Sequence, residues 1–223
     1  MGLGLDDRQS NRFIGFENNR VGNLSVLNEL NDKWNSEFAA GKLNFLRRDN
    51  EQVRLKLVAR LIHGHLEGEA VPLIDLGSGE GHLCKWLDEA KISQYVAVDI
   101  SDVALGNIVE AKIPVTRICQ SLATYFPDDE MKSSPLVIVA NEVLYYGADS
   151  VDQLKRIAEG QSENCLVVIS AVGPHPDKPN WTAASIKLWK EIDALGWCKL
   201  EVEIARDEES GVIWDIVIFK VTP

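Results

Sequence analysis

The chain has 223 residues, of which 45% are hydrophobic and 26% are charged, and its formal net charge is −11. Such a composition is typical of a globular protein with one large domain, or with one domain and a small cap. The charge argues against a nucleic-acid partner, because acidic residues outnumber basic ones by 34 to 23 and such binding depends on lysine and arginine contacts to phosphates.

The first residues and the cysteines argue against other classes. The opening, MGLGLDDRQS, lacks the basic and apolar regions of a secretory signal, and no apolar run reaches the roughly 18 residues that a membrane helix needs. The four cysteines lie more than thirty residues apart, which fits neither a zinc site nor a secreted disulfide framework. We therefore expect reduced thiols, no metal site, no membrane contact and a cytoplasmic location.

Residues 17–67 have a helical pattern. Hydrophobic side chains recur every three or four residues from Val21 to Phe38, as in one buried stripe. We expect Trp34 and Phe38 to pack in the core, with a place in a lid as the alternative. A second helix in "RRDNEQVRLKLVARLIHGHL" can be capped by Asp49. We expect residues 1–67 to form an N-terminal helical cap or lid, part of the same domain as a core at residues 68–223.

From residue 71 onward, apolar runs alternate with capped amphipathic segments. Val- and Ile-rich strands that alternate with helices of about ten residues predict an α/β fold with a parallel sheet buried on both faces. Helices are predicted near residues 82–90, after Ser101 and after Ser150. The strand-like runs are VPLIDL (71–76), YVAVDI (95–100), IPVTRI (113–118), PLVIVA (135–140) and NCLVVISA (164–171).

The end of the chain has a different pattern. A helix is predicted around residues 182–195, and two strand-like runs follow, "WCKLEVEIAR" and "GVIWDIVIFKV", joined by a short polar turn. Two strands joined so tightly form an antiparallel hairpin. The sequence therefore predicts five parallel strands followed by a hairpin at one edge, with a helical cap in front.

The stretch "LIDLGSGEGHL" (73–83) places three glycines behind the first strand. Such a loop allows close backbone approach, and the helix that follows directs its N-terminus at a carboxylate or phosphate. A nicotinamide site needs G-x-G-x-x-G, but His82 stands at the third glycine position, and the lysine of a P-loop is missing. The acidic residues Asp75 and Glu80 disfavour a pyrophosphate and suit an ammonium group beside a carboxylate.

"IDLGSGEG" resembles the first motif of the class I S-adenosylmethionine-dependent methyltransferases. The resemblance implies a Rossmann-like three-layer sandwich with a mostly parallel seven-stranded sheet, and S-adenosylmethionine as cofactor. In that family, the acid of "VAVDIS" accepts the ribose hydroxyls, the stretch "ICQSLATYFP" contacts adenine and "VIVANEVLYY" lines the path of the methyl group. The residues implied to bind the cofactor are Asp75, Gly77, Ser78, Gly79, Gly81, Asp99, Ile100, Ser121, Leu122 and Asn141.

One position departs from the family pattern. The family commonly has aspartate where it binds the adenine amino group, and Gln120-Ser121-Leu122 stands there in this chain. The side chain of Gln120 or Ser121 can still accept a hydrogen bond, and the Leu122 amide can serve the ring.

Three residues are candidates for catalysis. "EVLYY" at 142–146 is similar to the small-molecule branch that includes the nodulation-factor N-methyltransferases, and Glu142 there could steer a cationic amine or take its proton. Tyr146, or its neighbour Tyr145, could wall the pocket and face the sulfonium. His175 follows the fifth strand in a proline-rich loop and is either a general base for a hydroxyl acceptor or a surface-loop histidine.

These observations predict an enzyme that transfers a methyl group to the N or O of a small polar acceptor, such as an amino sugar or a natural-product intermediate. The altered adenine position leaves a non-catalytic S-adenosylmethionine-binding partner subunit as the alternative. A nicotinamide oxidoreductase and an RNA methyltransferase rank lower, and homodimerisation stays open.

Overall fold

A computed structural model describes residues 24–109, 111–147, 149–161 and 163–222. Its centre is one seven-stranded sheet with the order β3-β2-β1-β4-β5-β7-β6. Neighbouring strands are parallel except β7, which runs antiparallel to both β5 and β6. The strands are β1 (Val71–Leu76), β2 (Ile92–Asp99), β3 (Val115–Cys119), β4 (Leu136–Asn141), β5 (Cys165–Val172), β6 (Cys198–Arg206) and β7 (Ile213–Val221).

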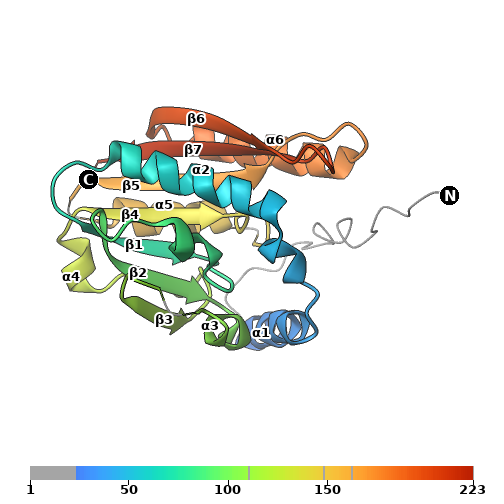
Figure 1. The fold of residues 1–223 in the computed structure, drawn as a ribbon, viewed down its shortest axis with the longest axis horizontal. Coiled ribbons are helices and arrows are strands. Elements are labelled where there is room, and N and C mark those ends of the chain that lie inside the picture. The colour runs from blue at the N-terminus through green and yellow to red at the C-terminus, as the bar shows by residue number, and fades with distance from the viewer. Residues whose placement is uncertain (1–23, 110, 148, 162, 223) are drawn as a thin grey trace.

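Helices cover the sheet on both faces and give a three-layer sandwich (Figure 1). One core cluster joins Leu55, Val58 and Ile62 of α2 to the sheet, and a second joins Leu154 of α5 and Leu188 of α6 to its other face. The helical elements are α1 (Leu24–Ala39), η2 (Asn44–Arg47), α2 (Asp49–His65), η3 (His82–Trp86), α3 (Asp102–Gly106), α4 (Asp129–Lys132), α5 (Ser150–Glu159) and α6 (Pro179–Asp193).

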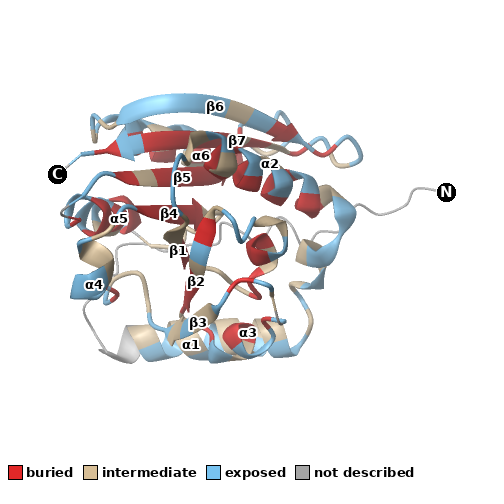
Figure 2. Cartoon of the chain, turned by 60° about the vertical axis from the view of Figure 1, so that its left-hand side comes forward, coloured by how far each residue is buried: buried red, intermediate tan, exposed pale blue. Residues whose placement is uncertain are grey.

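The inner strands are buried on both faces, whereas the edge strand β6 is largely exposed (Figure 2). This explains why the inner strands read as continuous apolar runs while β6 alternates with charged residues. No helix in the described part of the chain is long and apolar enough to cross a membrane.

The predicted helix near residues 82–90 is only the short η3. The amides of Lys91 and Ile92 both donate to the carbonyl of Asp88, so the chain already turns there into β2. Ser101 caps α3 as predicted, with its hydroxyl accepting from the Ala104 amide at 3.1 Å. Ser150 instead lies inside the first turn of α5, where its hydroxyl donates to the carbonyl of Gly147 at 3.0 Å, and Asp149 takes the cap position.

The helix α2 ties the N-terminal part of the chain to the C-terminal hairpin. Asn50 donates to the carboxylate of Asp207 at 2.8 Å, and Arg60 pairs with Glu203 of β6. Of the described N-terminal part, α2 packs in the core, whereas the segment from α1 to η2 projects beyond the carboxyl ends of the parallel strands (Figure 1).

The helix α1 lies beside α3 and is held there by two asparagines. The Asn31 amide donates to the carbonyl of Ile100. Asn35 accepts from the Ser101 hydroxyl at 2.6 Å and donates to the Asp102 carboxylate at 2.6 Å. These bonds fix α1 across the ends of β1 and β2.

Candidate active site

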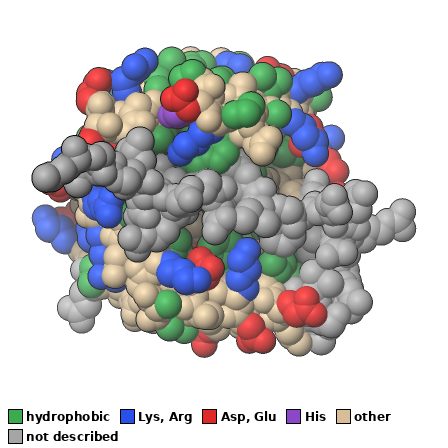
Figure 3. Space-filling model, turned by 90° about the vertical axis from the view of Figure 1, so that its right-hand side faces the viewer, with side chains coloured by type: hydrophobic (Ala, Val, Ile, Leu, Met, Phe, Trp, Pro, Cys, Tyr) green, Lys and Arg blue, Asp and Glu red, His purple; other side chains and the backbone are tan. Residues whose placement is uncertain are grey.

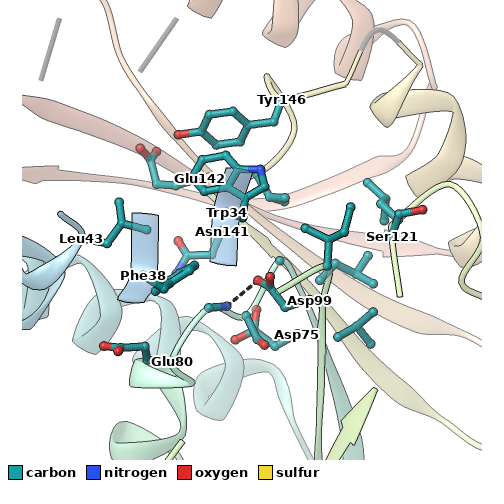
Figure 4. A pocket seen from close by; sticks show the side chains of 18 of the residues that line it. Trp34, Phe38, Leu43, Asp75, Glu80, Asp99, Ser121, Asn141, Glu142 and Tyr146 are labelled. Atoms are coloured by element: carbon teal, nitrogen blue, oxygen red, sulfur yellow. Dashed lines mark hydrogen bonds between the residues drawn. The ribbon is translucent and has the colours of Figure 1, made fainter. Parts of the chain in front are cut away.

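A cavity of about 790 Å³ lies between the carboxyl ends of β1, β2 and β4 and the segment from α1 to η2 (Figure 4). This is where open α/β sheets bind their ligands. The face at these strand ends shows hydrophobic side chains among lysines and arginines (Figure 3). All residues implied to bind a cofactor line the cavity except Gly81, which packs against Ile108 at the start of η3.

The glycine loop is shaped by its backbone. Gly77 and Ser78 donate their amides to the carbonyl of Val98 at 2.8 and 3.1 Å, which holds the loop against β2. Gly77 has φ +68°, and a Cβ atom added there would lie 2.4 Å from Cγ2 of Val143. Both the backbone conformation and the close approach therefore require glycine.

We expect Gly77→Ala to lower the free energy of unfolding by about 2–4 kcal/mol, because strain at positive φ is combined with a clash in the core. Gly211→Ala is the matched control, since Gly211 has φ +69° but nothing within 4 Å of its added Cβ atom. Urea denaturation should show a loss of about 1 kcal/mol in that control. Equal losses in the two variants would contradict the close-packing argument.

Asp99, at the end of β2, is the central acceptor of the cavity. One carboxylate oxygen accepts from the Gly79 amide (dashed in Figure 4) and the other from the Ser101 amide, both at 2.8 Å. Burial raises the pKa of Asp99, and these backbone hydrogen bonds oppose the rise. A carboxylate has about four acceptor positions, so two remain for vicinal hydroxyls of a ligand.

Asp75 lies deep in the cavity and is only 2% exposed. It accepts a hydrogen bond from the Tyr95 hydroxyl, and burial raises the pKa of Asp75 to about 7. The nearby charge of Arg54 acts in the opposite direction.

Arg54 of α2 is the cavity residue that the sequence did not single out. It is buried, donates to the Asn141 side chain and to Glu51, and lies over the Trp214 ring at 5.6 Å. An arginine in an amphipathic helix usually faces solvent, so no local pattern marks it as a site residue. Its burial beside Asn141, Glu51 and Trp214 becomes evident only from the fold.

Several buried polar atoms near the glycine loop have no hydrogen-bond partner within the described residues, among them Nε of Arg54, Oδ1 of Asp75, Oγ of Ser78 and Nδ1 of His82. Buried polar groups are normally paired, so such a cluster points to a ligand. A carboxylate on a ligand would match the guanidinium and hydroxyl donors, and an ammonium group would match Asp75. The arrangement suits the zwitterionic end of an amino acid.

Glu80, the second acid of the loop, is already engaged by protein groups. Arg47 of η2 contacts it through two nitrogens at 2.9 and 2.8 Å, and Asn107 donates to it at 3.0 Å. Burial opposes its ionisation, but these hydrogen bonds prevail and lower the pKa of Glu80. Its role is therefore to fasten η2 to the glycine loop rather than to bind an ammonium group.

The stretch after β3 forms the far wall of the cavity with Ile100. Ser121 and Leu122 are half-buried there, and the Ser121 hydroxyl lies 3.2 Å from that of Thr124. The Gln120 side chain is exposed, and the backbone N–H of Gln120 donates to the Asp99 carbonyl at 2.9 Å. This wall is apolar enough to receive a flat base, with Ser121 as the nearer polar group.

Glu142 and Tyr146 also line the cavity (Figure 4). Among the described non-glycine residues, only Glu142 has a positive φ, at 60°, and its amide donates to the Ser170 carbonyl at 2.8 Å. Strain of this kind concentrates at functional sites. Tyr146 contacts Trp34 edge-to-face at 5.1 Å, whereas Tyr145 turns toward the core and accepts from the Val172 amide.

His175 is not brought to this cavity. Its amide donates to the Thr182 hydroxyl at 3.0 Å, its ring accepts from the Asp177 amide at 3.2 Å, and the ring lies beside Trp181. The loop after β5 thus folds onto its own helix, α6. In the part of the chain that the structure describes, no three His, Cys, Asp or Glu side chains gather as metal ligands.

Comparisons with known proteins agree with the predicted family. A family model described as a methyltransferase domain matches residues 32–200. The chain matches no curated protein.

Solved structures share the fold at low sequence identity. The 1,6-didemethyltoxoflavin-N1-methyltransferase of Burkholderia thailandensis is 13% identical with a TM-score of 0.66, over 93% of each chain. The N-methyltransferase NodS of Bradyrhizobium japonicum is 12% identical with a TM-score of 0.61, over 80% of this chain and 99% of its own. The magnesium protoporphyrin IX methyltransferase of Synechocystis is 12% identical with a TM-score of 0.60, over 88% of this chain and 99% of its own.

Proposed function

This chain belongs to the methyltransferase-domain family, and we propose that it transfers a methyl group from S-adenosylmethionine to a nitrogen or oxygen of a small-molecule acceptor. The observation that carries the proposal is that Asp99 and the unpartnered atoms of Arg54, Asp75 and Ser78 line the same cavity around the glycine loop.

The residues present fit the parts of S-adenosylmethionine. Asp99 would accept the ribose hydroxyls, and Ser121 and Leu122 would contact the adenine. Asp75 would receive the ammonium group, while Arg54 and Ser78 would donate to the carboxylate. Two structures in this fold class, those of the toxoflavin-pathway and protoporphyrin enzymes, contain S-adenosylhomocysteine.

When bound, S-adenosylmethionine would supply an electrophilic methyl group, and its sulfur would keep both electrons of the carbon–sulfur bond. The protein's task is to align the acceptor's lone pair with the methyl group and to keep water away. Trp34 and Tyr146 close the cavity above the strand ends and offer ring faces to a positive charge. The Glu142 carboxylate accepts the proton that the acceptor atom loses. His175, remote from these groups, has no part in this scheme.

The proposal is tested by incubating the chain with methyl-labelled S-adenosylmethionine and a small-molecule extract of its source cells. Label in a small-molecule fraction supports it. Label in RNA would favour the RNA methyltransferase instead. Binding of S-adenosylhomocysteine without any transfer would favour the non-catalytic partner subunit.

With an acceptor in hand, Glu142→Gln is expected to lower kcat about tenfold while S-adenosylhomocysteine binding changes less than threefold, because glutamine keeps the shape but cannot take a proton. Glu208→Gln, an exposed acid outside the cavity, is the control. An unchanged kcat in Glu142→Gln would remove Glu142 from the proposed chemistry.

A further inference from the structure

The helix α1 presents two different faces. Asn31 donates to the carbonyl of Ile100, and Asn35 bonds to Ser101 and Asp102 at the start of α3, so this face holds the helix in place. The cavity face carries Leu27, Leu30, Trp34 and Phe38, spaced as one helical stripe, and all four are only half-buried. Lys33 and Glu37 flank this stripe, and the Lys33 ammonium lies 5.3 Å from the centre of the Trp34 ring. An apolar stripe that faces a cavity rather than a core suits an apolar occupant.

The segment after α1 extends the same apolar wall. Leu43, Phe45 and Leu46 line the cavity, while Arg47 turns away to Glu80. The charged side chains of this part lie at the mouth, where Lys42 and Glu37 pair at 3.2 Å with 58% and 29% of their side chains exposed. The polar groups suited to the cofactor therefore lie on the sheet side, and the opposite wall is apolar and aromatic.

From this division we propose that the acceptor is an aromatic ring system bearing an N–H group, rather than a free amino sugar. The inference rests on the proposed function and names the substrate class of the same site. Trp34, Tyr146 and Glu142 line the same cavity (Figure 4). In this proposal the acceptor's ring lies against Trp34 and Tyr146, and its N–H group is directed at Glu142.

The choice follows from the cost of burying hydroxyls. Each sugar hydroxyl placed against the apolar wall would lose its hydrogen bonds to water without gaining a partner there. The carbon face of an aromatic ring has no such hydrogen bonds to lose, and it gains contact with the Trp34 and Tyr146 rings. As the nitrogen's lone pair forms the bond to the methyl carbon, the electrons of the carbon–sulfur bond remain on sulfur and the N–H proton passes to Glu142.

The test is calorimetric titration of the chain saturated with S-adenosylhomocysteine, using 6-aminoquinoline and glucosamine as probes. We expect 6-aminoquinoline to bind and glucosamine to show no heat up to millimolar concentration. Trp34→Leu should weaken binding of 6-aminoquinoline at least tenfold and that of S-adenosylhomocysteine less than fivefold. Trp34→Phe should restore probe binding, and Trp197→Leu, an equally half-buried tryptophan outside the cavity, should leave it unchanged.

The outcomes separate this inference from the proposed function. If S-adenosylhomocysteine itself fails to bind, the proposed function falls and the inference falls with it. If S-adenosylhomocysteine binds but 6-aminoquinoline does not, or glucosamine binds more tightly, only the aromatic acceptor is overturned. Undiminished binding of 6-aminoquinoline to Trp34→Leu would overturn it as well.

Discussion

Replacing Asp99 by alanine is expected to weaken binding of S-adenosylhomocysteine by about a hundredfold or more. Hydrogen bonds to a charged acceptor contribute about 1.5–3 kcal/mol each, and two ribose hydroxyls would be lost together. The same carboxylate accepts from Gly79 and Ser101, so its removal also loosens the loop that shapes the cavity. Calorimetric titration at pH 7.5 measures the affinity directly.

Because Asp99 has this second, structural role, the alanine variant needs two control variants. Asp99→Asn keeps one acceptor oxygen and should bind with intermediate affinity, while Asp129→Asn changes a fully exposed acid and should bind normally. Thermal unfolding of each variant shows whether the fold is intact. An Asp99→Ala protein that unfolds lower but binds as tightly as the parent would assign Asp99 to the loop alone.

Asp75→Asn is expected to stabilise the ligand-free chain and to weaken its cofactor binding. The folded-state pKa of Asp75 is raised from 3.8 to about 7, so the native state holds the proton more tightly than the unfolded state. Stability is therefore highest below about pH 4 and falls as pH rises to about 7, by roughly 4 kcal/mol if the full shift is realised. Asparagine removes that loss and should raise the melting temperature at pH 8 by about 8–16 °C, at about 2–4 °C per kcal/mol for a chain of this size.

The same carboxyl group makes ligand binding depend on pH. Only the ionised Asp75 attracts an ammonium group, so S-adenosylhomocysteine should bind about tenfold more tightly at pH 7 than at pH 5.5. Asp75→Asn should bind more weakly and lose most of this dependence, whereas the exposed Asp152→Asn should keep it. Identical pH profiles for Asp75→Asn and the parent would show that another group governs the titration.

The strands of this fold can be predicted from the sequence, because each one corresponds to a short apolar run between two turns. Val71–Leu76 forms a strand with the predicted bounds, and the antiparallel hairpin at the end follows from its short polar turn. The helix expected near residues 82–90 does not extend that far, because backbone hydrogen bonds to the Asp88 carbonyl start the turn into β2. The helix propensity of these residues does not indicate that turn.

The residues that line the cavity are harder to predict from the sequence, because periodicity identifies an apolar helix face but not whether that face packs against the core or lines a cavity. Trp34 and Phe38 continue a regular stripe and are expected in the core, yet they line the cavity because Asn31 and Asn35 rotate α1 toward α3. Arg54 is not predicted as a site residue because a charged side chain in an amphipathic helix is expected to face solvent, yet it is buried. His175 follows β5 in the sequence, but its loop folds back on itself and does not bring the side chain to the strand ends.

The contacts between α2 and the C-terminal hairpin affect when the site forms as the chain is synthesised. All described residues that line the cavity precede residue 154, yet Arg54 is held over Trp214 of β7 and Asn50 is bonded to Asp207. A nascent chain that contains the complete glycine loop still lacks these supports. Such contacts of high sequence separation form late in folding. We therefore expect cofactor affinity to appear only after β7 has left the ribosome and can pack against α2.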